Sequence, residues 1–263
     1  MKEKIGIGVI TCNREDFCSK CIQSIPRDIV DETVVVNDGL PYSDSTYNNI
    51  YSIQHKNNTG VGISKNDAIR YLLDKDCTHI FLIEDDIIIK NADIFKKYIE
   101  SSNISGIKHL MFGYHGPANK EGNQPKARAI IEYPNNVRIA LNHHCVGAFC
   151  YYNRKGLDKV GLMDEKFLNA FEHVEHTHQF IKAGMLPAFW WFPDIADSCD
   201  YLSEQACSEV NSSIRPRSDW QKNIYNAFQY YTSKHGLSPV QTPDTAQEEV
   251  VSILKRIRKE HKI

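Results

Sequence analysis

Three consecutive acidic residues, Glu84, Asp85 and Asp86, follow an apolar run at positions 80–83. Such a run is typical of a strand that is buried on both faces. Carboxylates at the end of a buried strand are costly unless something pairs with them, and a divalent cation suits them because magnesium, manganese and calcium prefer oxygen ligands. Side chains alternate along a strand, so Glu84 and Asp86 are expected on one face and Asp85 on the other. The simpler alternative is that these acids end the strand and form ion pairs with surface lysine or arginine.

Two more strands are expected to end in polar loops beside these acids. Residues 5–10 and 33–36 are β-branched apolar runs, and a helix predicted over residues 15–25 connects them. A strand, a helix and a strand in this order form a βαβ unit, whose ligands bind at the carboxyl ends of the strands. The two loops contribute the polar residues Thr11, Asn13, Arg14, Asn37 and Asp38. With the acidic loop, three polar loops are predicted to converge on one crevice.

A glycine-containing turn precedes the acidic strand. Gly60 and Gly62 lead into a helix that is predicted over residues 64–74, with Lys65 at its start. The free N–H groups and positive potential of a helix N-terminus suit a phosphate group, and Lys65 would add charge. The glycine spacing fits neither a P-loop nor a complete G-x-G-x-x-G motif. A plain glycine turn into a helix would be the better interpretation without the acidic strand beside it.

The order and spacing of these motifs resemble the nucleotide-sugar-binding half of GT-A glycosyltransferases, especially of the family 2 type. The matching segments are Thr11-x-Asn13-Arg14, Val36-Asn37-Asp38-Gly39, Asn57-x-x-Gly60 with Asn66, and Glu84-Asp85-Asp86. The likeness continues through residues 146–149, 161–167 and 172–175 as far as Gly184. It implies an α/β fold of the GT-A (Rossmann-like) type, with a mixed, mostly parallel sheet flanked by helices.

The resemblance implies a role for each polar loop. Asp38 would contact the base of the nucleotide, and Asp86 would ligate a manganese or magnesium ion that bridges the diphosphate. Glu84 and Asp85 would lie near the ribose or the sugar. The other donor-binding residues that it implies are Thr11, Asn13, Arg14, Gly60, Lys65 and Asn66. The metal would neutralise the charge that develops on the leaving nucleoside diphosphate.

Glu172 falls where the family keeps its catalytic base. A carboxylate there would take the proton from an acceptor hydroxyl while this oxygen attacks the anomeric carbon, and the anomeric centre would be inverted. His173 stands where the family usually has Asp, and Glu175 replaces a second Asp. Either Glu172 or Glu175 could therefore be the base, with Glu172 preferred. Asp197 stands where many of these enzymes have a late histidine ligand, so it is the candidate for a second metal ligand.

Two other clusters raise the question of a zinc or redox site. Cys18 and Cys21 form a C-x-x-C, but no second pair stands at zinc spacing. His173, His176 and His178 follow each other closely on a predicted helix, where residues three apart share a face. Such a cluster is more often surface histidine, so neither site is the preferred interpretation.

The chain changes character towards its C-terminus. We expect a GT-A domain over residues 1–205, with a nucleotide-sugar-binding half (1–110) and an acceptor-side half (111–205), and then a helical C-terminal extension over residues 206–263. The last predicted helix, residues 246–261, has an apolar stripe beside several lysines and arginines. A basic amphipathic helix could contact an anionic membrane or nucleic acid. The preferred interpretation is that its apolar stripe packs on the domain or on another subunit, as in a homo-oligomer.

The charge balance and the cysteine content indicate the class of partner and the cellular compartment. The 31 Lys and Arg against 33 Asp and Glu give a formal net charge of −2, which makes no general electrostatic case for nucleic acid. The eight cysteines are scattered, as in proteins of a reducing compartment. No N-terminal apolar segment approaches a signal peptide or the roughly 20 residues of a transmembrane helix. We therefore expect a cytoplasmic protein without a transmembrane segment.

The resemblance and the residues together predict a metal-dependent glycosyltransferase with Mn²⁺ or Mg²⁺ as its cofactor. It would transfer a hexosyl or pentosyl group from a nucleoside-diphosphate sugar, with UDP preferred, to a glycan, a glycoprotein or a modified nucleic acid. One alternative is a nucleotidyltransferase of similar architecture, which would release pyrophosphate. The other is a nucleotide-sugar or glycan-binding module without turnover, which the altered acids at His173 and Glu175 suggest.

Overall fold

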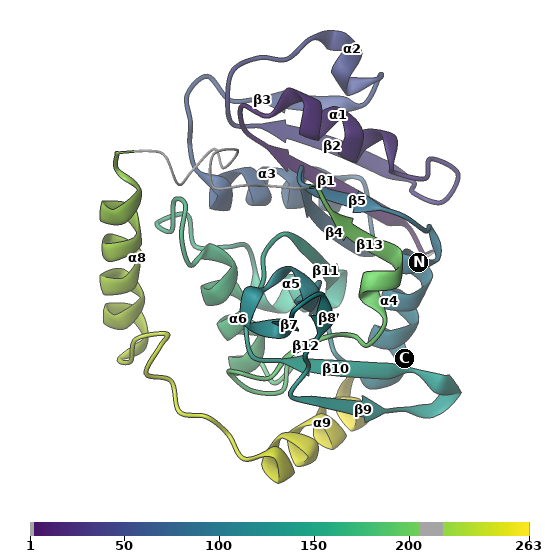
Figure 1. Ribbon diagram of the computed structural model, residues 1–263, viewed down its shortest axis with the longest axis vertical. Helices are drawn as coiled ribbons and strands as arrows, with labels where there is room; N and C mark the ends of the chain where they lie inside the picture. The colour runs from purple at the N-terminus through teal and green to yellow at the C-terminus, as the bar shows by residue number, and fades with distance from the viewer. Residues whose placement is uncertain (1–2, 206–217, 263) are drawn as a thin grey trace.

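The computed structural model describes residues 3–205 and 218–262, and a six-stranded sheet with the order β3-β2-β1-β4-β11-β6 lies at its centre (Figure 1). Strands β3, β2, β1 and β4 run parallel, whereas β11 runs antiparallel to both of its neighbours. The strands are β1 (Ile5–Thr11), β2 (Glu32–Asn37), β3 (Tyr51–Gln54), β4 (His79–Glu84), β6 (His109–Met111) and β11 (Phe149–Asn153). This arrangement confirms the predicted mixed, mostly parallel sheet.

Helices cover both faces of this sheet (Figure 1). The α-helices of residues 3–205 are α1 (Glu15–Gln23), α2 (Asp44–Tyr47), α3 (Val61–Asp74), α4 (Asp93–Ser105), α5 (Arg154–Val160), α6 (Glu172–Lys182) and α7 (Ser198–Tyr201). Helix α3 packs so closely on β1 that a Cβ atom at Gly8 would lie 2.6 Å from the Cβ of Ala68. On the opposite face, Phe95 and Tyr98 of α4 pack edge-on against Phe81 of β4. Close packing of this kind holds the strand ends and helix N-termini in fixed relative positions.

The register of the parallel strands brings three polar loops to one edge of the sheet. Ile10 of β1 pairs with Val36 of β2 on one side and with Glu84 of β4 on the other. Parallel strands with this register end at the same edge, so the segments that follow them meet there. The predicted convergence of the loops is confirmed.

Smaller sheets accompany the six-stranded sheet in the described part of the chain. Strands β9 (Ala129–Glu132), β10 (Arg138–Asn142) and β12 (Phe192–Ile195) form an antiparallel sheet, and β7 (Lys120–Glu121) pairs with β8 (Gln124–Pro125). Strand β13 (Leu202–Glu204) pairs with β5 (Ile87–Ile89), which follows the acidic residues. This pairing returns the chain to the site edge, where Gln205 N–H donates a hydrogen bond to the carbonyl oxygen of Asp86 at 2.6 Å.

Two long helices, α8 (Trp220–His235) and α9 (Gln247–His261), form the C-terminal part of the described chain. Val250, Leu254 and Ile257 of α9 are buried, and α9 meets the end of α4, where a Cβ at Gly106 would lie 2.6 Å from the carbonyl oxygen of Ile257. The apolar stripe of α9 therefore packs on the domain. The predicted division between residues 205 and 206 stays a prediction, since residues 206–217 lie outside the described part.

Tryptophan side chains of the domain form hydrogen bonds with the segment between α8 and α9. Trp190 Nε1 donates a hydrogen bond to the carbonyl oxygen of Thr242 at 2.8 Å, and Trp191 Nε1 donates one to that of Thr245 at 2.9 Å. Arg128 also binds the carboxylate of Asp244 with both of its terminal nitrogens. Helix α9 is thus tied to the three-stranded sheet as well as to α4. Among the described helices, none combines the length and the apolar composition that crossing a membrane requires.

Truncation of a buried side chain on α9 should measure how much its packing stabilises the fold. We expect Leu254→Ala to lower the free energy of unfolding by about 2–5 kcal/mol, because Leu254 is 2% exposed and its removal leaves a cavity. Lys255→Ala, on the exposed side of the same helix, is the control and should change the free energy of unfolding by less than about 0.5 kcal/mol. Chemical denaturation, monitored by circular dichroism, measures this free energy for both variants. Equal stabilities of the two variants would contradict the packing of α9 on the domain.

Candidate active site

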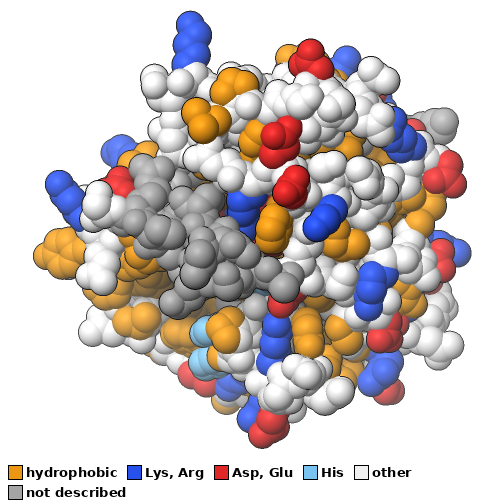
Figure 2. Space-filling model, turned by 45° about the horizontal axis from the view of Figure 1, so that its top comes forward, with side chains coloured by type: hydrophobic (Ala, Val, Ile, Leu, Met, Phe, Trp, Pro, Cys, Tyr) orange, Lys and Arg blue, Asp and Glu red, His pale blue; other side chains and the backbone are white. Residues whose placement is uncertain are grey.

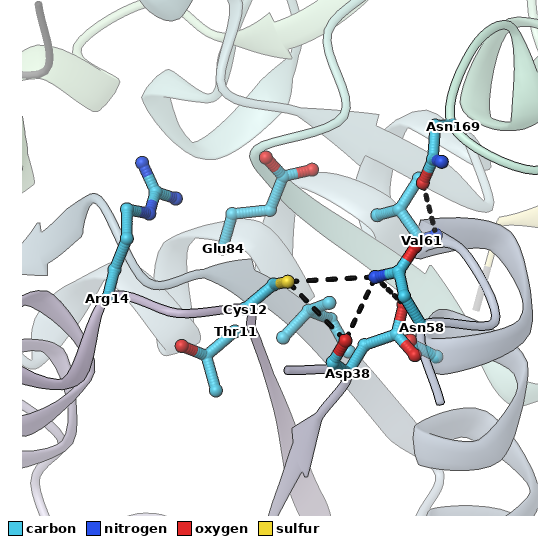
Figure 3. A pocket seen from close by; sticks show the side chains of 10 residues that line it. Thr11, Cys12, Arg14, Asp38, Asn58, Val61, Glu84 and Asn169 are labelled. Atoms are coloured by element: carbon cyan, nitrogen blue, oxygen red, sulfur yellow. Dashed lines mark hydrogen bonds between the residues drawn. The ribbon is translucent and has the colours of Figure 1, made fainter. Parts of the chain in front are cut away.

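Two adjoining hollows lie at the carboxyl ends of β1, β2 and β4. The smaller has a volume of about 50 Å³ and is drawn in Figure 3, where the side chains of Thr11, Arg14 and Asp38 lie around it. The larger has a volume of about 910 Å³ and extends towards β11, α6 and α8. Both hollows are lined by Val61, Glu84 and Asn169. The small pocket therefore adjoins a much larger cavity.

Asp38 organises the loop that leads into α3. Its Oδ1 accepts hydrogen bonds from Thr59 N–H and Thr59 Oγ1 at 2.7 and 2.9 Å and lies 2.7 Å from Nδ1 of His55. Its Oδ2 accepts from Asn58 Nδ2 at 2.7 Å and from Gly60 N–H at 2.8 Å. Both carboxylate oxygens are thus engaged within the protein. Asp38 lines the small pocket, as predicted, but it shapes the loop around a ligand and offers little free capacity to read a base.

Asp85 is buried beneath the acidic turn and anchors the loop after β1. Thr11 Oγ1 donates a hydrogen bond to Asp85 Oδ2 at 2.6 Å, and Arg14 pairs with Asp85 Oδ1. Burial raises the pKa of Asp85 to about 7, against the opposing effect of Arg14. As expected from alternation, Asp85 points away from the cavity that Glu84 and Asp86 line. Asp85 therefore positions Thr11 and Arg14. The family resemblance implied a different place for Asp85, beside the ribose or the sugar of the donor.

Asp86 presents an unsatisfied carboxylate oxygen at the edge of the large cavity. Its Oδ2 lies 3.3 Å from Nη1 of Arg14, whereas its buried Oδ1 has no hydrogen-bond partner among the described residues. Burial and the nearby charge of Glu84 raise the pKa of Asp86. A buried oxygen without a donor is costly, and a divalent cation would remove that cost. The residues present at this position therefore fit a metal ion.

The described residues offer no group of three His, Cys, Asp or Glu side chains that could hold a metal alone. This fits a magnesium or manganese site in which one or two carboxylates act together with substrate phosphates and water. Asp197, the predicted second ligand, lies apart from Asp86. Its carboxylate pairs with Lys97 of α4 at 2.6 Å, and it lines a different cavity. Asp86 follows β4, whereas Asp197 stands between β12 and α7, and sequence spacing alone did not indicate that the fold keeps them apart.

Lys65 connects the acidic end of β4 to the first turn of α6. It is 1% exposed, and its Nζ lies 2.9 Å from Glu84 Oε1 and 3.2 Å from Glu172 Oε1, and donates to the carbonyl oxygen of Gly147 at 3.1 Å. Burial alone would lower the pKa of Lys65, but the two carboxylates outweigh it and raise that pKa. The ammonium group of Lys65 thus forms ion pairs with two carboxylates of the protein. The sequence predicted instead that Lys65 would add positive charge for a phosphate group at the start of the helix.

The first turn of α6 places Glu172 and His173 at the wall of the large cavity. Glu172 Oε1 lies 3.0 Å from Nδ1 of His173. Burial would raise the pKa of Glu172, but His173 and Lys65 outweigh it and hold that pKa well below its usual range. Glu175 is 1% exposed and pairs with Lys234 and His235 of α8. Of the two acids between which the sequence left the choice open, only Glu172 lines the cavity.

Three other predicted site residues build the frame. Asn13 has a φ of 56° and accepts the N–H of Leu40 at 2.8 Å, which holds the loops after β1 and β2 together. Gly60 has a φ of 99°, and a Cβ there would lie 2.4 Å from the carbonyl oxygen of Leu168. Asn66 is buried and bonds both the N–H and the carbonyl oxygen of Met163 at 2.9 Å. They fix the backbone around the pocket and lie outside the set of side chains that line it.

The predicted alternatives for a zinc or redox site do not come together in the described structure. His176 Nε2 lies 2.9 Å from the carbonyl oxygen of Gly161, and His178 Nδ1 lies 2.6 Å from the hydroxyl of Tyr231, so the histidines of α6 face different partners. Cys18 and Cys21 are both buried on α1, and burial raises the pKa of both thiols, Cys18 to about 12. The two cysteines therefore pack in the core, and the two histidines contact groups within the protein.

The structure adds site residues that sequence reasoning missed. Asn169 accepts the N–H of Val61 at 3.3 Å through Oδ1, and Figure 3 shows its amide directed towards the hollow. His115 lines the large cavity with Glu204, and their Nδ1 and Oε1 atoms lie 3.1 Å apart. Burial would lower the pKa of His115, but Glu204 and Asp86 outweigh it and raise that pKa. Asn169 stands in a loop, His115 ends a short 3-10 helix and Glu204 ends β13. None of the three belongs to a recognisable motif, so only the fold brings them to the site.

Comparison with known proteins gives structural neighbours but no match in sequence. No protein-family model matches the chain, and no curated protein sequence matches it. The solved structure of S. aureus TarS is 14% identical with a TM-score of 0.58, over 98% of this chain and 43% of TarS. Glucosyl-3-phosphoglycerate synthase from Mycobacterium tuberculosis, solved with Mn²⁺ and UDP, is 12% identical with a TM-score of 0.53, over 93% of this chain and 82% of the synthase.

A third neighbour is mannosyltransferase PcManGT from Pyrobaculum calidifontis, solved in complex with GDP-Man and Mn²⁺. It is 13% identical with a TM-score of 0.50, over 97% of this chain and 69% of the neighbour. The chain thus spans less than half of TarS and larger shares of the other two. At this level of identity the likeness establishes architecture: the protein has the GT-A fold that these glycosyltransferases share.

Proposed function

We propose that the protein is a metal-dependent glycosyltransferase that moves a hexosyl or pentosyl group from a nucleoside-diphosphate sugar to an acceptor hydroxyl, with inversion. The observation that carries this proposal is the set of residues that line the large cavity. Asp86, with its unsatisfied carboxylate oxygen, and the Glu172–His173 pair both line it. A metal-binding acid and a proton-accepting pair in one cavity are what transfer between two bound substrates requires.

On the donor side, we assign the nucleotide to the junction of the two hollows, with one end in the small pocket. Thr11, Arg14 and the loop held by Asp38 surround this pocket, and Arg14 lies where a guanidinium group could also bind a diphosphate. Asp86 would hold the metal ion, which when bound would neutralise the charge on the departing diphosphate. UDP is the preferred nucleotide, and since one structural neighbour was solved with GDP-Man, a GDP-sugar is the second donor to test.

On the acceptor side, the Glu172–His173 pair would receive the hydroxyl proton. Attack from the end of the cavity opposite the diphosphate would displace it in line and invert the anomeric centre. The wall beyond this pair contains Phe171 and, from α8, Trp220. Aromatic faces of this kind support a glycan acceptor, free or on a glycoprotein.

Nucleic acid is the least supported acceptor. On the face shown in Figure 2, lysine and arginine side chains are interspersed with aspartate and glutamate. The apolar stripe of the basic helix α9 is used in packing on α4. A cytoplasmic location rests on the cysteine content and remains a prediction, and no disulfide bond joins the described cysteines.

Calorimetric titration of the wild-type protein with UDP, GDP and their common sugar conjugates tests the proposal. We expect one nucleotide to bind in the presence of Mn²⁺ and to lose most of its affinity in the presence of a chelator, because the ion that Asp86 would hold would neutralise the charge of the diphosphate. Product analysis then separates the alternatives: release of nucleoside diphosphate supports a glycosyltransferase, and release of pyrophosphate supports a nucleotidyltransferase. Donor binding without any turnover would instead support a binding module, and no binding at all would overturn the proposal.

A further inference from the structure

The Glu172–His173 pair has one buried and one exposed member. Nδ1 of His173 lies 3.0 Å from Oε1 of Glu172, and 4% of the Glu172 side chain is exposed against 26% for His173. Both residues line the large cavity. The group that an acceptor in this cavity can touch most readily is therefore the imidazole, with the carboxylate behind it.

The surroundings of Glu172 fix the roles of the two imidazole nitrogens. The same Oε1 atom that faces His173 lies 3.2 Å from the ammonium group of Lys65. This cation and His173 hold the pKa of Glu172 well below its usual range, although burial opposes them. An ionised carboxylate only accepts hydrogen bonds, so Nδ1 of His173 must donate. In the neutral ring, Nε2 then carries the free electron pair.

The imidazole ring is also held in place by the backbone at Gly147. A Cβ atom at Gly147 would lie 2.9 Å from Cγ and 3.0 Å from Nδ1 of His173. A side chain at this position would push the ring away from its carboxylate. A glycine before β11 thus allows the ring to rest against the backbone that also accepts a hydrogen bond from Lys65.

We propose that His173 is the catalytic base of the transfer reaction and that Glu172 is its positioning residue, an inference that rests on the proposed function. Nε2 of His173 accepts the proton of the acceptor hydroxyl while the hydroxyl oxygen forms its bond to the anomeric carbon. The bond from this carbon to the diphosphate oxygen breaks, and the departing nucleoside diphosphate takes the electron pair. The imidazolium then returns its proton to water. Carboxylate-oriented imidazoles act in this way in other families of enzymes.

The charged and titratable groups around His173 come from several elements. They are Glu172 on the same helix, Lys65 of α3, Glu84 of β4 and His109 of β6, with Asp86, His115, Lys120, His144 and Glu204 on the wall of the same cavity. Of these, Glu172 is the group whose contact with the ring is a hydrogen bond. The charge of Glu172 should therefore dominate the response of the pair to pH.

The tautomer of His173 in the wild-type protein is the first test, and it needs no substrate. Long-range proton–nitrogen correlation spectra at pH 8 should show the neutral ring with its proton on Nδ1, and the signal is assigned by its loss in His173→Gln. A proton on Nε2 would overturn the proposal, because that nitrogen could then accept nothing. The tautomer is measured on the wild type, so the variant serves only to assign the signal and its activity does not enter the result.

Kinetics give the second test, with water as the acceptor and the donors UDP-glucose, UDP-galactose, UDP-N-acetylglucosamine and GDP-mannose as probes. On the donor that the wild type hydrolyses fastest, His173→Gln should lower the rate by about 10²–10⁴-fold and leave Mn²⁺-dependent nucleotide affinity unchanged. His261→Gln is the matched control, since His261 lies on α9 away from the cavity, and it should keep the wild-type rate.

The pH–rate profile separates positioning from a merely structural role. Loss of a neighbouring carboxylate destabilises an imidazolium, so Glu172→Gln should lower the rate and move the acidic limb of the profile to lower pH. A wild-type rate in His173→Gln with intact nucleotide binding would overturn the base assignment alone. Absence of nucleotide binding by the wild type would overturn the proposed function, and the inference with it.

Discussion

Replacement of Lys65 by methionine should lower the free energy of unfolding by about 3–5 kcal/mol and abolish sugar transfer. The side chain of Lys65 is 1% exposed, and it lies between the carboxylates of Glu84 and Glu172. Removing one partner of a buried ion pair leaves an uncompensated buried charge, and here two carboxylates would lose their common cation. The same change would release Glu172 from its position behind His173, so activity should fall even where the protein folds.

Urea denaturation at several pH values measures this effect, and Lys96→Met, at an exposed position of α4, is the matched control. The pKa of Glu172 is depressed in the folded protein, so the corresponding stabilisation is present at neutral pH and is lost as the pH falls. The stability gap between wild type and Lys65→Met should accordingly narrow below about pH 4. If Lys65→Met were as stable as Lys96→Met at pH 7, the cation would not have the bridging role that its contacts indicate.

Asp86→Asn should abolish the metal dependence of nucleotide binding. We expect the affinity for UDP in the presence of Mn²⁺ to fall by about 100-fold, or about 2.8 kcal/mol, because an amide oxygen is a poorer ligand than a carboxylate for a hard cation. In the presence of a chelator, wild type and variant should bind the nucleotide alike. Stability should be unchanged or slightly higher, because the substitution replaces a buried carboxylate that has one oxygen without a partner.

Asp197→Asn provides the matched control for this experiment. Asp197 pairs with Lys97 at 2.6 Å, with more than a third of each side chain exposed, and it lines a separate cavity. Its replacement should cost about 0–1 kcal/mol of stability and leave Mn²⁺-dependent binding intact. Calorimetry on the two variants side by side decides the metal assignment. A loss of affinity in Asp197→Asn that equals the loss in Asp86→Asn would restore Asp197 as a ligand.

The amino-acid sequence by itself determined the architecture around the site. Apolar runs that end in polar residues mark β1, β2 and β4, and parallel strands must place such ends at one edge of a sheet. The opposite orientation of Asp85 and Asp86 also follows from local alternation. These features depend on residues that are close in sequence, so their pattern is visible without the fold.

Only the tertiary structure decided which partner each side chain has. Lys65 was predicted to serve a phosphate, but its two carboxylate partners stand 19 and 107 residues further along the chain. Asp38 was predicted to read a base, yet its oxygens are engaged by the loop before α3. Asp197 has the expected position in the order of motifs, but in the fold its carboxylate pairs with Lys97 of α4. The identity of a residue fixes its charge and hydrogen-bonding capacity, whereas burial and long-range packing determine which groups are near enough to use them.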